Sequence, residues 1–164
     1  MQKRIAPVDL EGLPITYRKE IPESYRDEMG HMNVMWYTHL FSYAFDKFGE
    51  LWGFNWANWK ARGVGSFVLQ THIRYLAEVR VGQHVTLRSR ALARSAKRFH
   101  YMHFMTVDET EVLAATSEQI SAHMDMRIRR MSPLAPDVAA RFDELVARQN
   151  ELGWDPPVCG AMTP

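Results

Sequence analysis

The stretch "YRDEMGHMNVMWYTHLF" (residues 25–41) joins a polar loop to an aromatic, apolar segment. Beyond the loop, apolar residues recur at the spacing of one helix face, namely Tyr37, Leu40, Phe41, Ala44, Phe48, Leu51 and Trp52. This spacing predicts a helix over 33–52, ended by Gly53. Other apolar residues fall outside that face, namely Val34, Met35, Trp36, Tyr43 and Phe45. We therefore expect the helix to lie in the core, with other structure wrapped around it.

The sequence after this helix changes to strand-like runs. Residues 54–65 predict a short helical or irregular connection, and β-branched or aromatic runs follow at 66–79, 83–94, 97–107 and 111–128. Short turn segments separate these runs, which is typical of an antiparallel meander. In the second run, Val85, Leu87, Ala91 and Ala93 alternate with Arg88, Arg90 and Arg94. This alternation predicts a sheet with one solvent-exposed face.

The two ends of the chain complete the predicted architecture. Residues 1–14 predict an irregular N-terminal lead-in, and 15–21 predict a strand with Ile15, Tyr17, Lys19 and Ile21 on one side. Residues 137–150 predict a closing amphipathic helix, so 15–133 would form the main domain and 134–164 a C-terminal helix and tail. The fold class is therefore predicted to be α+β, with an antiparallel sheet wrapped around one long central helix.

A single sheet with one central helix leaves an edge strand and apolar surface uncovered. Association with further copies of the chain covers both. We therefore expect a homodimer or a homotetramer.

The composition excludes several classes of protein. The 164 residues suffice for one domain, and 46% hydrophobic with 24% charged residues indicate a globular chain. A formal net charge of +1 argues against nucleic acid as a partner. Cys159 is the only cysteine, which excludes an internal disulfide and a Cys-rich metal site. The sequence shows no signal-peptide pattern and no membrane-length apolar run, so we expect a cytoplasmic protein without a membrane partner.

The polar loop has the residue types that acyl transfer onto water requires. Asn33 is a favourable N-cap residue, so the start of the helix would lie beside Asp27. Amides at a helix N-terminus stabilise a developing oxyanion, and a nearby carboxylate acts as a nucleophile or a general base. The same residues also suit an ordinary turn followed by an N-cap. The residue types alone leave both interpretations open.

The segment "DEMGHMNVMWY" (27–37) resembles the Asp-x-x-Gly-His-Val-Asn-Asn-x-x-Tyr signature of the hotdog-fold acyl-CoA thioesterases, the 4-hydroxybenzoyl-CoA thioesterase-like group. The matching positions are Asp27, Gly30, His31, Asn33 and Tyr37. A second segment, 73–124, is similar to the strand pattern of that family, in which a Tyr-Leu pair precedes a Gly-Asp turn. The two segments together cover about residues 15–133.

The resemblance implies a hotdog fold, an obligate dimer with active sites at the subunit interface, and thioester hydrolysis without a metal. It implies that Asp27 is the catalytic acid, that the amides around Gly30 and His31 polarise the thioester carbonyl, and that Asn33 belongs to the same motif. It implies no cofactor, with coenzyme A present only as part of the acyl-CoA substrate. Whether Asp27 attacks the carbonyl or activates water stays open. Several positions differ from the family pattern, which leaves the acyl group open too: Tyr25, Val34, Glu78 and Gln83.

Four of the five tryptophans gather in one part of the chain, at Trp36, Trp52, Trp56 and Trp59. In one interpretation they fill the core and the dimer interface. In the other, Trp36, Trp52 and Trp56 join Tyr37 in an acyl pocket that holds a cationic head group against aromatic faces. The second interpretation predicts a betainyl-type acyl-CoA as the substrate. An aromatic or aliphatic acyl group is the alternative.

Basic side chains are candidates for binding the phosphates of coenzyme A. Lys97 and Arg98 are the favoured pair, whereas the arginine row of the second run suits either this role or a solvated sheet face. His100 and His103 have a spacing that suggests metal binding. Residues three apart in a strand face opposite sides of the sheet, so we expect no metal there.

An acyl-CoA thioesterase is the leading hypothesis for the function. A hotdog enoyl-CoA hydratase would pair Asp27 with His31 to add water to an enoyl thioester. A non-catalytic acyl-CoA binding or sensor protein is a third possibility, because a fold does not fix a function.

Overall fold

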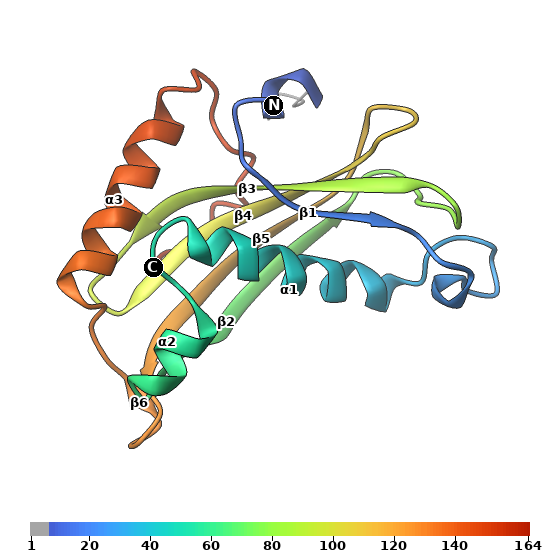
Figure 1. Ribbon diagram of the computed structural model, residues 1–164. Helices are drawn as coiled ribbons and strands as arrows, with labels where there is room; N and C mark the ends of the chain where they lie inside the picture. The colour runs from blue at the N-terminus through green and yellow to red at the C-terminus, as the bar shows by residue number, and fades with distance from the viewer. Residues whose placement is uncertain (1–6) are drawn as a thin grey trace.

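The computed structural model describes residues 7–164, so the predicted lead-in is described from residue 7 onward (Figure 1). The chain runs through η1 (Pro7–Leu10), β1 (Ile15–Glu20), η2 (Glu23–Tyr25), α1 (Val34–Glu50), α2 (Trp56–Ala61), β2 (Val64–Tyr75), β3 (His84–Arg94), β4 (Arg98–Val107), β5 (Val112–Asp125), β6 (Arg130–Met131) and α3 (Pro136–Asn150). The predicted central helix and closing helix are present. The predicted meander holds for β3, β4 and β5 but is wrong for β2, which pairs with β5 and not with β3.

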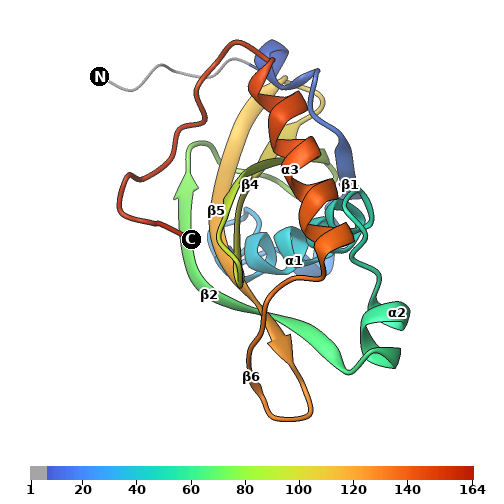
Figure 2. The same ribbon diagram turned by 90° about the vertical axis from the view of Figure 1, so that its left-hand side faces the viewer.

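The strands form one antiparallel sheet in the order β1-β3-β4-β5-β2, and β6 pairs with β5. The sheet curls around α1, which lies in its concave side (Figure 2). This arrangement confirms the predicted α+β fold, an antiparallel sheet wrapped around one long helix. The strand β2 is at one edge of the sheet and β1 is at the other.

The helix α1 begins and ends where its local sequence dictates. The side chain of Asn33 accepts a hydrogen bond from the amide of Met35, which caps the first turn. The apolar face buries Leu40, Phe41, Ala44 and Phe48 completely against the sheet. The expected position in the core is confirmed for this apolar face, but other structure of the same chain does not cover Val34, Met35 and Tyr43, which are exposed. Val34 and Met35 lie in the first turn of α1, and the Tyr43 ring stacks on Tyr17 of β1, with centroids 5.4 Å apart.

The helix α3 belongs to the same hydrophobic core as the C-terminal end of α1. Phe142 packs edge-on against Trp52, with ring centroids 5.3 Å apart. The strand β1 pairs with β3 only as far as Arg88. Beyond that point, the side chain of Gln149 on α3 forms hydrogen bonds with the backbone of β3. It accepts a hydrogen bond from the amide of Ala91 and donates one to the carbonyl of Ser89. The helix thus satisfies backbone groups that would otherwise be an open sheet edge.

The outer face of the sheet is covered, so the predicted solvent-exposed face is wrong at the arginine row. Arg90 is 2% exposed, its guanidinium lies 4.3 Å from the centre of the Trp154 ring, and it donates to the Trp154 carbonyl. Arg88 donates to the carbonyl of Leu13, and Arg94 pairs with Asp143 of α3. The alternation of apolar and charged residues in β3 does not predict that its outer face is covered, because the residues that cover it come from both ends of the chain.

The first strand also differs in detail from the prediction. The register of β1 against β3 shifts between Ile15 and Tyr17, so Ile15 is exposed and Thr16 is buried. Thr16 then donates to the carbonyl of Leu87 and shares a 2.7 Å hydrogen bond with Ser89. The expected apolar side therefore holds for Tyr17 and Ile21 but not for Ile15.

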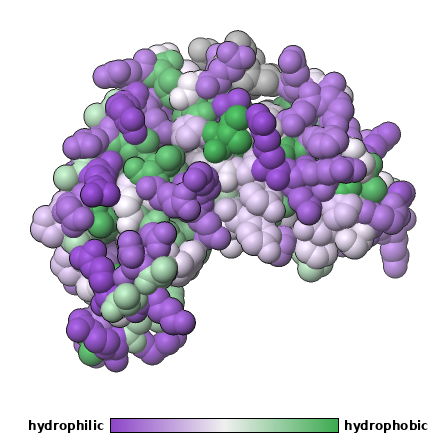
Figure 3. Space-filling view, in the orientation of Figure 1, coloured by the Kyte–Doolittle hydropathy of each residue, from purple (hydrophilic) through white to green (hydrophobic). Residues whose placement is uncertain are grey.

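The molecule is arched. Figure 3 shows α2 and the β5–β6 hairpin projecting at the lower left, with a hollowed lower edge beside them, and polar side chains over most of this face with apolar patches between them. None of the helices formed by residues 7–164 combines the length and the apolar character that a membrane span requires.

Candidate active site

The loop between η2 and α1 is folded tightly by its own backbone. The amide of Asp27 donates to the carbonyl of His31 (2.8 Å), and the amide of Gly30 donates back to the carbonyl of Asp27 (3.1 Å). Gly30 has a φ of +90°, which glycine adopts without strain. The amide of Met32 donates to the carbonyl of Val79, which fastens the loop to the segment after β2. The loop thereby holds the Asp27 side chain at the start of α1.

The Asp27 carboxylate is bound by donors from this same loop. Its Oδ1 accepts hydrogen bonds from the amides of Met29 (2.8 Å) and His31 (3.3 Å). Its Oδ2 lies 3.1 Å from Nδ1 of the His31 ring. The resemblance assigns the amides around Gly30 and His31 to the thioester carbonyl. In this state the His31 amide donates to the Asp27 carboxylate and the Gly30 amide donates to the Asp27 main-chain carbonyl. Their assignment to the thioester carbonyl stays a prediction.

These hydrogen bonds determine the charge of the site. Burial alone would raise the pKa of Asp27, but the amides of His31 and Met29 and the nearby imidazole outweigh burial and lower that pKa below its ordinary value. Asp27 is therefore ionised at neutral pH. An ionised carboxylate at this position is able to act as a nucleophile or as a general base.

A hollow of about 400 Å³ opens beside Asp27. Its lining combines the loop, the first turn of α1 and the end of β2: Asp27, His31, Met32, Val34, Tyr37, Tyr75, Leu76, Ala77 and Glu78. The rings of Tyr37 and Tyr75 meet edge to face, with centroids 5.1 Å apart. Burial raises the pKa of Tyr37, and the charges of Glu78 and Asp27 act in the same direction. Sequence reasoning missed Tyr75 as a member of the site, because its contact with Tyr37 joins β2 to α1.

The aromatic residues predicted for the acyl pocket are divided between the two ends of α1. Trp36 is half-buried near the loop and stacks on Tyr25, with ring centroids 3.8 Å apart. Trp52 is fully buried in the core, and Trp56 is exposed on α2, where its indole donates to Asp46. Trp52 and Trp59 confirm the core interpretation of the tryptophan cluster. A helix of 17 residues is about 25 Å long, so Trp52 and Trp56 do not reach Asp27 of the same chain.

Lys97 and Arg98 also lie at the other end of the molecule. Arg98 pairs with Ala122 on β5, whereas Tyr75 of the hollow pairs with Ala115. Seven positions along a strand span about 23 Å. Within one chain the structure therefore does not bring Lys97 and Arg98 to Asp27, and their role in binding phosphate stays a prediction.

The two histidines with metal-like spacing face opposite sides of the sheet, as expected. His103 is buried on the side of α1, with its ring centroid 6.0 Å from that of Phe41. His100 lies on the outer side, where its Nε2 is 2.8 Å from Oε1 of Glu118. The two imidazoles do not form a common site.

A curled antiparallel sheet around one helix is the hotdog fold, and the carboxylate loop at the N-terminus of that helix suits thioester hydrolysis. Comparison with known proteins agrees: the sequence model described as the thioesterase-like superfamily matches residues 15–142. The chain therefore belongs to the thioesterase-like superfamily. The predicted family, the hotdog fold and the thioester hydrolase class are confirmed.

Individual relatives are similar to this chain over most of its length. The betainyl-CoA thioesterase of Pseudomonas aeruginosa PAO1 is 30% identical over 137 residues, covering 84% of this chain and 86% of the relative. The crystal structure of a candidate thioesterase from Pseudomonas putida KT2440 is 28% identical, with a TM-score of 0.76 and coverage of 93% and 96% of the two chains. The DHNA-CoA thioesterase of Staphylococcus aureus shares the fold at 20% identity, with a TM-score of 0.76 and coverage of 82% and 92%.

Proposed function

We propose that this thioesterase hydrolyses betainyl-CoA, with the quaternary ammonium of the acyl group held beside Asp27. The hollow next to the Asp27 carboxylate, lined by two tyrosines and a second carboxylate, carries this proposal. The similarity to a betainyl-CoA thioesterase over most of both chains supports the same substrate.

The covalent structure of the substrate places strict limits on where its cation lies. In a betainyl thioester, one methylene separates the quaternary nitrogen from the reacting carbonyl carbon. The groups that hold the cation must therefore adjoin Asp27 itself. Tyr37 and Tyr75 line the same hollow as Asp27, and aromatic faces attract quaternary ammonium by about 0.5–2 kcal/mol per contact. These two tyrosines therefore replace Trp52 and Trp56 as the proposed aromatic contacts.

Glu78 adds a negative charge to the same hollow. One oxygen of its carboxylate pairs with Arg80, so its other oxygen is the one proposed to face the cation. A carboxylate near the acyl group favours a cationic acyl chain and disfavours an anionic one.

The reaction adds water across the thioester. In the general-base route, Asp27 takes a proton from water while the water oxygen attacks the carbonyl carbon. The C–S bond then breaks, and the proton passes from Asp27 to the CoA thiolate, which leaves betaine, CoA thiol and the ionised Asp27. In the nucleophilic route, Asp27 attacks first, CoA leaves, and water then cleaves the mixed anhydride. Both routes need the ionised carboxylate that the loop hydrogen bonds stabilise.

We further propose that the active protein is a homodimer that pairs through β2. The strand β2 is at the edge of the sheet, and consecutive residues at its centre are exposed, including Phe67, Val68 and Leu69. An exposed apolar edge strand pairs with a partner strand, and a two-fold axis lets one surface serve both copies. A tetramer would need a second interface.

The experiment that tests the substrate compares two thioesters of nearly equal shape. Betainyl-CoA and 3,3-dimethylbutyryl-CoA differ in that a quaternary carbon replaces the quaternary nitrogen, so only the charge changes. Thiol release with each is measured for the wild type and for Asp27→Asn. We expect a higher kcat/KM for betainyl-CoA in the wild type and a loss of at least about a hundredfold in the variant, which is the usual scale of general-base catalysis.

Other outcomes have distinct meanings. Equal rates with both thioesters would reject the cationic substrate while leaving a thioesterase. Equal rates in the wild type and in Asp27→Asn would remove Asp27 from the mechanism.

A further inference from the structure

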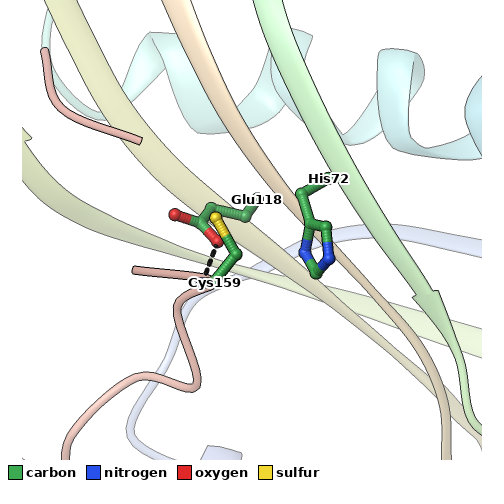
Figure 4. Close-up of side chains that lie close together, drawn as sticks. All are labelled: His72, Glu118 and Cys159. Carbon is green, nitrogen blue, oxygen red and sulfur yellow. Dashed lines mark hydrogen bonds between the residues drawn. The ribbon is translucent and has the colours of Figure 1, made fainter. Parts of the chain in front are cut away.

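A group of potential metal ligands lies on the sheet face that turns away from α1 (Figure 4). His72 comes from β2, Glu118 from β5 and Cys159 from the C-terminal segment, and one ligand atom from each lies within 4.8 Å of the others. His72 and Glu118 are directly paired neighbours, and Glu118 is also paired with Met102, which packs in the outer cluster with Trp154. The group is therefore separated from the Asp27 site by the sheet.

Glu118 is the least expected member of this group, because its side chain is 0% exposed. Its Oε1 lies 2.8 Å from Nε2 of His100, and its Oε2 accepts a 2.6 Å hydrogen bond from the amide of Cys159. An ionised carboxylate has about four acceptor positions, so these two contacts leave lone pairs available. Burying a carboxylate is costly unless a cation or several hydrogen bonds compensate for it.

The three groups together form a donor set that suits zinc. Thiolate sulfur, imidazole nitrogen and carboxylate oxygen are all zinc ligands, and a zinc ion held by three protein ligands takes water as its fourth ligand. Bond lengths of about 2.0–2.3 Å in a tetrahedron place the ligand atoms roughly 3.5 Å apart. Neither His72 nor Cys159 is fully buried, so rotation of their side chains would close the remaining distance.

We propose that His72, Glu118 and Cys159 bind a zinc ion that fastens the C-terminal segment to the outer face of the sheet. A thiolate and a carboxylate together neutralise the dication, which suits a site whose carboxylate is fully buried. His100 contacts the Glu118 carboxylate and would orient it toward the ion. Residues that form hydrogen bonds to metal ligands usually have this role. The ion takes no part in thioester hydrolysis, because it lies on the opposite side of the sheet from Asp27.

The test measures zinc binding by the full-length chain after chelator treatment. Isothermal titration with zinc gives the stoichiometry and affinity for the wild type, His72→Ala and Cys159→Ser. We expect one zinc ion per chain, and at least about tenfold weaker binding in each variant. Replacement by cobalt adds an independent readout, because a thiolate-to-cobalt absorption band would appear in the wild type and disappear in Cys159→Ser.

The control variant is His84→Ala, which removes an exposed histidine at the first residue of β3. It should bind zinc as the wild type does. Failure of the wild type to bind zinc stoichiometrically, or unchanged binding in His72→Ala and Cys159→Ser, would overturn the proposal. Because His72 and Cys159 are not fully buried, their replacement is expected to leave the fold intact, and circular dichroism checks this.

Discussion

The donors around Asp27 make a prediction about pH. The folded-state pKa of Asp27 is lowered, so the carboxylate stays ionised until the pH falls below the ordinary value of 3.8. If Asp27 must be ionised to act, kcat/KM should not decline between neutral pH and about pH 5. Initial rates of thiol release across this range check the prediction, and an acidic limb centred above pH 5 would contradict it.

Tyr75 offers a matched pair of substitutions for the proposed cation contact. Tyr75→Phe keeps an aromatic face, whereas Tyr75→Leu removes it. We expect Tyr75→Leu to lower kcat/KM for betainyl-CoA by about 2-fold to 30-fold, the kinetic equivalent of 0.5–2 kcal/mol, and Tyr75→Phe to retain most of the activity.

The control for this pair is the neutral substrate 3,3-dimethylbutyryl-CoA. Its hydrolysis should respond equally to Phe and Leu at position 75. If Tyr75→Leu lowers kcat/KM equally for both thioesters while Tyr75→Phe does not, Tyr75 shapes the hollow without recognising charge.

At the scale of secondary-structure elements, β2 is the element whose sequence and environment disagree most. Its central side chains are apolar and exposed, with Val68 56% exposed in the single chain. We expect Val68→Lys to place a charge at the proposed pairing edge and to convert the dimer to a monomer, as lysine does on natural edge strands. Light scattering coupled to size exclusion measures the mass.

Ile15→Lys is the control for added charge. Ile15 is 38% exposed on β1, at the opposite edge of the sheet from β2. This variant should keep the dimer mass. A dimer that persists in Val68→Lys would place the interface elsewhere.

At the scale of the whole molecule, a buried imidazole links stability to pH. His103 is fully enclosed between α1 and the sheet and lies 2.6 Å from the hydroxyl of Ser89, and burial lowers its pKa to about 3. The unfolded chain has the ordinary value of 6.5 and binds the proton first, so stability is fully present above pH 6.5 and declines as the pH falls towards 3.

Linkage sets the size of this effect. Between pH 7 and pH 5, His103 should reduce the free energy of unfolding by about 2 kcal/mol. Urea denaturation at the two pH values measures the change. In His103→Asn, which keeps a polar group near Ser89, the difference between the two pH values should shrink by a similar amount, whatever the absolute stability of the variant. An unchanged difference would contradict the assignment to His103.

Much of the fold was predictable because it depends on local interactions. The helical spacing from Tyr37 to Phe48, the Asn33 cap and the meander of β3, β4 and β5 depend on neighbours close along the chain, and each was found close to its expected place. The pairing of β2 with β5 joins distant segments, and the alternation of residues did not predict it. The Asp27 loop was also predictable, since its hydrogen bonds join residues within a few positions of one another. Its similarity to the thioesterase motif identified the family.

The sequence by itself determined the central helix, the order of the strands along the chain and the acidic loop, because short-range hydrogen bonding and side-chain periodicity encode them. The tertiary structure alone decided which residues gather at Asp27 and which are buried at the far end of α1. It brought Tyr75 to Tyr37, enclosed Arg90 beneath Trp154 and placed His72, Glu118 and Cys159 together. These contacts join residues far apart along the chain, so only the packing of the folded sheet, helices and C-terminal segment specifies them.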